Sequence, residues 1–145
     1  MIREGAFVRA NFPFGHPPTA RSRPGPYLHI CYCLGSRIQA GRTTEIMLAH
    51  TSSGPWRGVS VQLPLGIIEF TATDAARLNQ RPFHIDLRCL ARVLPSADWF
   101  PDWNASDQGV VAIADAAVKE RILREAERLA RSGPDIIEIR GINRR

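Results

Sequence analysis

The chain has 145 residues, of which 44% are hydrophobic and 23% are charged, the composition of an ordinary globular domain rather than of a disordered or fibrous chain. Its three cysteines, Cys31, Cys33 and Cys89, are too few for a disulfide framework and lack the paired CxxC pattern of a zinc site. No signal-like segment and no run of about 18 apolar residues is visible. We therefore expect one domain in the reducing cytoplasm, with no membrane contact.

Positive charge gathers at the two ends of the chain. The net charge is +5 overall, made up of +5 in residues 1–42, −3 in residues 43–118 and +3 in residues 119–145. Such a surplus makes polyanions such as RNA the first partners to consider. A second interpretation remains open, because Lys119 is the only lysine among the 19 positive residues and such an arginine bias also arises from a GC-rich genome.

The first 95 residues predict at least five short strands. Residues 6–12 (AFVRANF) alternate as a half-buried strand does, and Pro13 ends them. The stretch to residue 26 is rich in proline and glycine, so we expect a loop. Period-two patterns then predict the remaining strands, with residues 35–42 as a long hairpin turn; these strands are residues 27–34, 43–50, 58–64, 82–87 and 89–95.

The C-terminal part changes its period from two to that of a helix. Asp115 is the expected N-cap, and Gly133 followed by Pro134 ends the helix. Its apolar stripe is expected to comprise Val118, Ile122, Leu123, Ala126 and Leu129. Residues 135–141 are expected to add a last edge strand or to dock on the body. The sum is a mostly β protein, a small barrel closed by one C-terminal helix that covers an edge or face of the sheet.

The motifs for several chemistries are missing. The histidines at positions 16, 29, 50 and 84 lack the spacing of a metal site, and no G-x-S-x-G, P-loop or G-x-G-x-x-G sequence occurs. We therefore expect neither a metal nor a cofactor.

Two clusters of loop residues suit a phosphodiester. Arg21, Arg23 and His16 share the loop before the second strand, where a guanidinium can clamp a phosphate. Thr51, together with Ser52 and Ser53, follows an apolar strand and offers hydroxyl and amide groups. RNA carries its own nucleophile, the 2′-hydroxyl, so cleavage needs only proton transfer and charge stabilisation.

Each of these residues also has an ordinary structural interpretation. A Thr-Ser-Ser-Gly run is usually a turn, a loop arginine is usually solvated, and Asp86 suits an exposed or salt-bridged strand position. The aromatic residues Trp99, Phe100 and Trp103 could stack on bases, although a core or dimer contact is the favoured interpretation.

The order of several short motifs resembles the PemK/MazF family of toxin endoribonucleases. Gly5 opens a strand that NFPFG closes, a loop ends in Arg23-Pro24, and an apolar strand ends in HTSSG. The later segment RPFHIDLRCLARVLPSADWF is similar to a branch of that family. The resemblance covers roughly residues 4–131, which makes residues 1–145 a single PemK/MazF-like domain with residues 132–145 as a C-terminal extension.

The resemblance implies an SH3-like barrel that forms a homodimer and binds single-stranded RNA in a groove at the dimer interface. It implies a type II toxin that leaves a 2′,3′-cyclic phosphate without metal and that a cognate antitoxin neutralises. The implied catalytic residues are Arg23, Thr51, Ser52 and Asp86, and the implied RNA-binding residues are His16, Arg21, Ser53 and Arg88.

Two alternatives stay open at this point. Gly25 and Pro26 interrupt the expected passage from Arg23-Pro24 into the next strand, which favours a catalytically silent barrel that binds RNA or a protein partner. A DNA-gyrase poison is a third reading, because the related fold hosts that activity and fold alone does not determine function.

Overall fold

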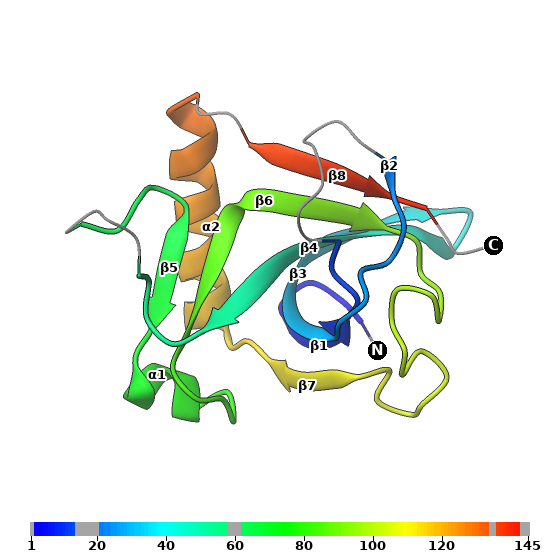
Figure 1. Ribbon diagram of the computed structural model, residues 1–145, viewed down its shortest axis with the longest axis horizontal. Coiled ribbons are helices and arrows are strands. Elements are labelled where there is room, and N and C mark those ends of the chain that lie inside the picture. The colour runs from blue at the N-terminus through cyan, green and yellow to red at the C-terminus, as the bar shows by residue number, and fades with distance from the viewer. Residues whose placement is uncertain (1, 14–20, 58–61, 134–135, 143–145) are drawn as a thin grey trace.

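A computed structural model describes residues 2–13, 21–57, 62–133 and 136–142. The chain is a mostly β protein with one long C-terminal helix, α2 (Figure 1). Its elements are β1 (Ala6–Ala10), β2 (Arg21–Ser22), β3 (His29–Gln39), β4 (Arg42–Ser53), β5 (Ile67–Phe70), α1 (Ala72–Ala76), β6 (Phe83–Val93), β7 (Val110–Ile113), α2 (Ala116–Arg131) and β8 (Ile137–Gly141).

All eight strands of the described residues join one mixed sheet. The order is β2-β8-β6-β4-β3-β1-β7, and β5 pairs with the first half of β6. Most pairs are antiparallel, whereas β8 runs parallel to both β6 and β2. The two ends of this order, β2 and β7, do not pair with each other within the described residues, so the sheet is open. The SH3-like barrel stays a prediction.

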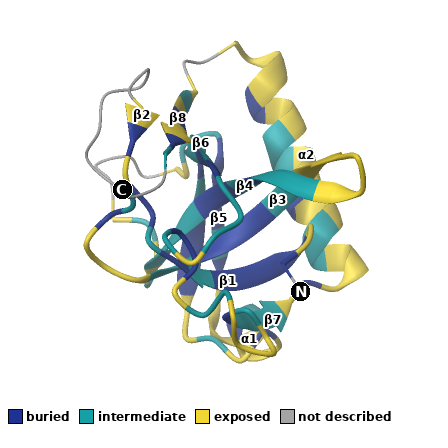
Figure 2. Ribbon diagram, turned by 90° about the vertical axis from the view of Figure 1, so that its right-hand side faces the viewer, coloured by how far each residue is buried: buried dark blue, intermediate teal, exposed yellow. Residues whose placement is uncertain are grey.

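The central strands are buried on both faces. Alternate residues of β1, β3 and β4 enter two hydrophobic cores, so that Val8 lies in the first core and Phe7 in the second. Helix α2 covers the second core with Ile122 and Leu129, and its outer face is exposed (Figure 2). The expectation of a half-buried first strand was therefore wrong, because only Arg9 of β1 is not fully buried.

The hairpin of β3 and β4 is longer than its sequence pattern indicated. The expected turn of residues 35–42 is mostly strand, and the chain reverses at Ala40 and Gly41, whose φ angles are 50° and 76°. Positive φ at two successive residues is typical of the tight turn that fits the twist of a hairpin. At the other end, β4 runs on to Ser53, so the Thr51 to Ser53 hydroxyls lie on the strand rather than in a turn after it.

Three further expectations needed correction. The two strands predicted at 82–87 and 89–95 are one strand, β6, whose pairing with β4 jumps from Leu90 to Asp86 across a bulge. The loop expected before residue 27 contains the short strand β2, which pairs with β8. Strand β8 is not at an edge, because it lies between β6 and β2.

The C-terminal helix was predicted closely. Asp115 is its N-cap and accepts a hydrogen bond from the Val118 amide at 2.9 Å. Leu123 departs from the expected stripe, since its side chain is 52% exposed. Strands β5 and β7 and helix α1 were not expected from the sequence patterns. A strand was expected at residues 58–64, of which 58–61 lie outside the described residues and 62–64 are not strand. None of the helices in the described segments has the length and apolar run that crossing a membrane needs.

Candidate functional site

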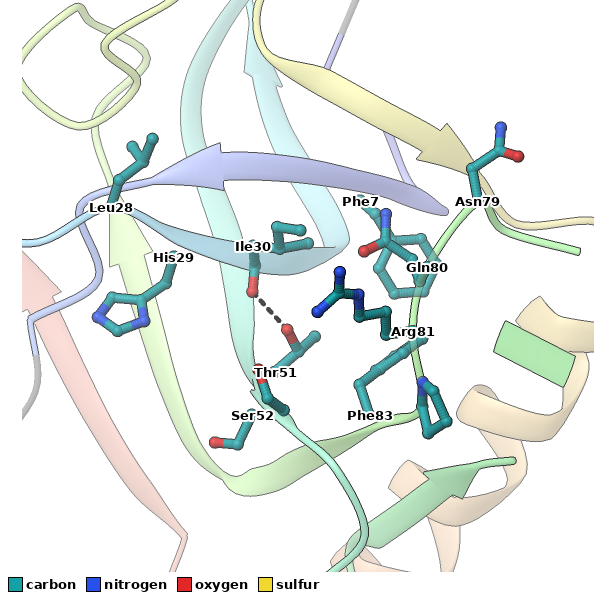
Figure 3. A pocket seen from close by; sticks show the side chains of 12 residues that line it. Phe7, Leu28, His29, Ile30, Thr51, Ser52, Asn79, Gln80, Arg81 and Phe83 are labelled. Atoms are coloured by element: carbon teal, nitrogen blue, oxygen red, sulfur yellow. Dashed lines mark hydrogen bonds between the residues drawn. The ribbon is translucent and has the colours of Figure 1, made fainter. Parts of the chain in front are cut away.

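A cleft of about 740 Å³ opens where β3 begins and β4 ends (Figure 3). Three segments form its walls: the start of β3, the last residues of β4, and the turn that leads into β6. Phe7 of β1 lies at its base as part of the second core. The lining residues are Phe7, Leu28, His29, Ile30, Thr51, Ser52, Ser53, Asn79, Gln80, Arg81, Pro82 and Phe83.

The hydroxyl of Thr51 is held in a fixed direction. Its Oγ1 donates a hydrogen bond of 2.8 Å to the carbonyl oxygen of Ile30 on the neighbouring strand (Figure 3). Because a hydroxyl has one proton and two lone pairs, this bond leaves the oxygen able to accept from a ligand. The predicted residues Ser52 and Ser53 line the same cleft. Ser53 shares the face of β4 with Thr51, whereas the Ser52 side chain points to the other face.

Arg81 supplies a cation that the sequence analysis did not single out. Its side chain lies in the cleft near Thr51 and comes from the turn before β6 (Figure 3). The turn is built by α1, because the amides of Asn79 and Gln80 bond back to the carbonyls of Ala76 and Ala75. Asn79 has a φ of 55°, which reverses the chain. The signal that could have found Arg81 is its sequence, Arg-Pro before a strand, which repeats the Arg23-Pro24 pattern.

The opposite face of the same strand ends carries a separate polar cluster. His50 pairs with Asp86 and Ser52 pairs with His84 across β4 and β6, so these side chains share one face. The ring of His84 makes a 2.9 Å hydrogen bond through Nδ1 with the carbonyl oxygen of Gly54. Arg88 lies over the Trp56 ring at 5.1 Å.

Asp86 is held by Arg88. Its carboxylate accepts hydrogen bonds from Nε of Arg88 at 3.0 Å and from a terminal nitrogen at 2.9 Å. Burial by itself would raise the pKa of Asp86, but the hydrogen bonds and charge of Arg88 outweigh burial, so the pKa lies below its ordinary value. A carboxylate with a lowered pKa is a weak proton acceptor. The pair therefore suits a structural role better than that of a general base.

Two histidines near the strand ends have altered acidity. Burial lowers the pKa of His50, an effect that the charge of Asp86 partly offsets. Burial also lowers the pKa of His29, which lines the cleft. Both imidazoles are therefore more fully neutral at pH 7 than an ordinary histidine.

The two predicted arginines of the loop lie away from this cleft. Arg21 is in β2 beside β8, and Arg23 follows directly after β2 and is not among the described lining residues. Gly25 ties this segment to β1, because its amide donates to the Asn11 carbonyl at 3.0 Å. His16, the remaining predicted RNA-binding residue, lies outside the described residues.

The aromatic residues of the ADWFPDW segment belong to the interior. Trp99 and Phe100 are fully buried in the first core, and Trp103 packs against it. The favoured core interpretation is confirmed for them, and they are not positioned to stack on bases.

No group of three His, Cys, Asp or Glu side chains in the described segments is arranged to hold a metal ion. Comparisons of the chain with protein-family models, with curated proteins and with solved structures gave no match. The functional interpretation therefore depends on the geometry of the cleft and on the resemblance of the sequence motifs.

Proposed function

We propose that this protein is a metal-independent endoribonuclease, the toxin of a type II toxin-antitoxin system, acting on single-stranded RNA in the cytoplasm. The observation that carries the proposal is the cleft that gathers the hydroxyls of Thr51 and Ser53 and the Arg81 guanidinium, with Ser52 also in its lining. A guanidinium and several hydroxyls are the groups that recognise a phosphate. The order of the sequence motifs supports the same assignment.

The reaction is a transfer within the RNA. The 2′-hydroxyl loses its proton, its oxygen forms a bond to phosphorus, and the bond from phosphorus to the 5′-oxygen breaks as that oxygen takes up a proton. The products are a 2′,3′-cyclic phosphate and a 5′-hydroxyl. Arg81 would stabilise the charge that develops on the phosphate oxygens, and the Thr51 hydroxyl would help to orient them once its proton turns from the Ile30 carbonyl to a phosphate oxygen. His29 lines the cleft and its lowered pKa keeps it neutral at pH 7, as a proton acceptor must be.

The proposal includes the finer fold and the partners that the resemblance implies. These are an SH3-like barrel, a homodimer and a cognate antitoxin that blocks the RNA groove. The bulge in the pairing of β6 with β4 supports a barrel, because bulges bend a strand and are common at barrel rims. Strand β4 lies along one edge of β6, and β5 and β8 follow each other along the other edge. Arg23 stays a predicted catalytic residue, now with Arg81 as the cation that lies in the cleft.

The test is cleavage of single-stranded RNA in EDTA by purified protein. We expect Arg81→Gln and Thr51→Val to lower the rate by about 100-fold, the usual effect of removing one group that stabilises transition-state charge. Thr51→Ser keeps the hydroxyl and should retain most of the activity. Arg131→Gln at the end of α2 makes the same charge change as Arg81→Gln, far along the chain from the cleft.

The outcomes test the enzymatic activity and also distinguish between Arg23 and Arg81 as the phosphate-binding arginine. Absence of any 2′,3′-cyclic phosphate product with the wild-type protein would overturn the enzyme proposal. If Arg23→Gln abolishes cleavage and Arg81→Gln does not, Arg23 rather than Arg81 is the arginine that binds the phosphate, as the sequence motif indicated.

A catalytically silent protein that binds RNA or a protein partner is the second candidate. Two observations favour it: Arg23 lies outside the cleft, and the Asp86 carboxylate is already engaged by Arg88. Retarded migration of an RNA that stays intact over long incubation would support this candidate.

A further inference from the structure

Strand β8 brings arginines that are distant in sequence into one row on neighbouring strands. No local sequence pattern indicates this row. The strand inserts between β2 and β6 so that Arg140 pairs directly with Arg21 on one side and with Arg92 on the other. Paired residues on adjacent strands point to the same face about 5 Å apart. Like charges in this position repel each other, so the arrangement costs stability unless an anion binds there.

A hollow with a volume of about 550 Å³ lies beside two of these arginines. Arg92 and Arg140 line it together with Arg37 from the hairpin of β3 and β4. We call Arg21, Arg37, Arg92 and Arg140 the arginine row. Arg21, Arg37 and Arg140 have exposed side chains, whereas Arg92 is half-buried.

Of the row, Arg92 alone has a carboxylate within ion-pair distance in the described residues, although Glu45 is also the strand partner of Arg37. Arg92 is bound by Glu138 and lies 3.9 Å from a carboxylate oxygen of Glu45. Arg21, Arg37 and Arg140 form no ion pair with any residue in the described segments. Arg37 and Arg140 therefore keep their donors available in the lining of the hollow, and Arg21 lies beside Arg140 on the next strand.

We propose that the arginine row binds the sugar-phosphate backbone of the single-stranded RNA whose cleavage we propose above. A guanidinium donates two parallel hydrogen bonds to one phosphate, a contact that does not depend on base sequence. The row is within reach of an RNA in the cleft, because Arg92 pairs with Met47, only four residues before Thr51 on β4. Four strand residues span about 13 Å, which is a distance of a few nucleotides.

The binding test uses a fluorescent 2′-O-methyl RNA of about 12 nucleotides, which lacks the reacting hydroxyl, and measures anisotropy at several salt concentrations. We expect Arg140→Gln and Arg21→Gln each to weaken binding about fivefold at low salt. Each should also reduce the slope of log affinity against log salt by about 0.7, the value for one released counterion on a single strand. Arg140→Lys should keep the slope, since it keeps the charge.

Two controls make the result specific. Arg131→Gln removes an exposed arginine at the end of α2 and should leave affinity and slope as in the wild type. The melting temperature of Arg140→Gln should equal or exceed that of the wild type, because the substitution removes a like-charge pairing. A loss of affinity together with unchanged stability would support a binding role.

Failure of this inference can be told from failure of the proposed function. If RNA is cleaved but Arg140→Gln binds with the affinity and slope of Arg131→Gln, the arginine row is not an RNA surface and the enzyme proposal stands. If Arg140→Gln reduces the slope of log affinity against log salt but the wild-type protein cleaves no RNA, the arginine row is an RNA surface and the enzyme proposal is wrong. If Arg140→Gln binds RNA as the wild type does but no longer binds poly-glutamate, the RNA assignment is overturned in favour of an acidic protein.

Discussion

Gly25 lies against the end of β1, where no larger side chain fits. A Cβ atom at this position would stand 2.3 Å from the carbonyl oxygen of Phe12, well inside van der Waals contact. We predict that Gly25→Ala lowers the free energy of unfolding by about 1–3 kcal/mol, as overpacking of a close contact does. Urea denaturation measures this change. Gly35→Ala is the matched control, because a Cβ there meets nothing within 4 Å; an equal loss in both variants would contradict the argument.

The same glycine shows what residue patterns could and could not reveal. From the sequence, Gly25 and Pro26 were an interruption of a family pattern, because the contact that requires glycine joins residues 25 and 12 through the fold. Thr51, which lines the cleft, could be singled out because its signal is local: a hydroxyl run directly after an apolar stretch. Arg81 was missed because its place in the cleft depends on the pairing of Phe83 with Ser53 on another strand.

At the scale of elements, signals within one segment predicted α2 correctly. The strand predictions were less accurate, because strands depend on pairing with distant segments. The helix is specified by its N-cap, its apolar period and its glycine end, all within one segment. Strand β8 is held by pairing with both β2 and β6, and more than 100 residues separate β2 from β8 in sequence. A two-residue strand such as β2 is too short to show an alternating pattern in the sequence.

The N-terminus of α2 offers a test of two separable contributions. Asp115 caps the helix through the Val118 amide and also forms an ion pair with Arg77 at 2.6 Å. We expect Asp115→Ala to lower the free energy of unfolding by about 1 kcal/mol, the usual value of an N-cap. Asp115→Asn keeps the cap and loses the charge, so it should cost less than half as much, because exposed ion pairs contribute little. Equal losses by chemical denaturation would assign the effect to the ion pair instead.

For the whole molecule, the periods of the sequence correctly indicated a mostly β chain with a terminal helix, whereas they could not give sheet order or strand direction. Period-two patterns show which residues share a face, but not which strand lies beside which. Burial of the central strands on both faces follows from that order, because β1, β3 and β4 are flanked by other strands and covered by both cores. The polar cluster behind the cleft is a consequence of the same topology.

That cluster predicts how global stability depends on pH. Burial lowers the pKa of His50 below its ordinary value of 6.5, with Asp86, His84 and His29 as the charged or titratable groups near it. The unfolded chain therefore binds a proton at this residue more readily than the folded protein does. By linkage, stability contributed here is present above the unfolded pKa and falls as the pH drops below about 6.5.

Asp86 affects the stability of the protein in a lower pH range than His50 does. Its lowered pKa means that stability is present above its ordinary value of 3.8 and is lost as the pH falls further.

We expect His50→Gln to show a smaller loss of unfolding free energy between pH 7.5 and pH 5 than the wild type, measured by urea denaturation at both values. Glutamine also gives up the contact of the His50 ring with Phe12, at 5.2 Å between centroids, which lowers stability at both pH values alike. Only the difference between the two pH values therefore reports on the proton. If that difference is the same in the variant and the wild type, the acid sensitivity has its origin at another group.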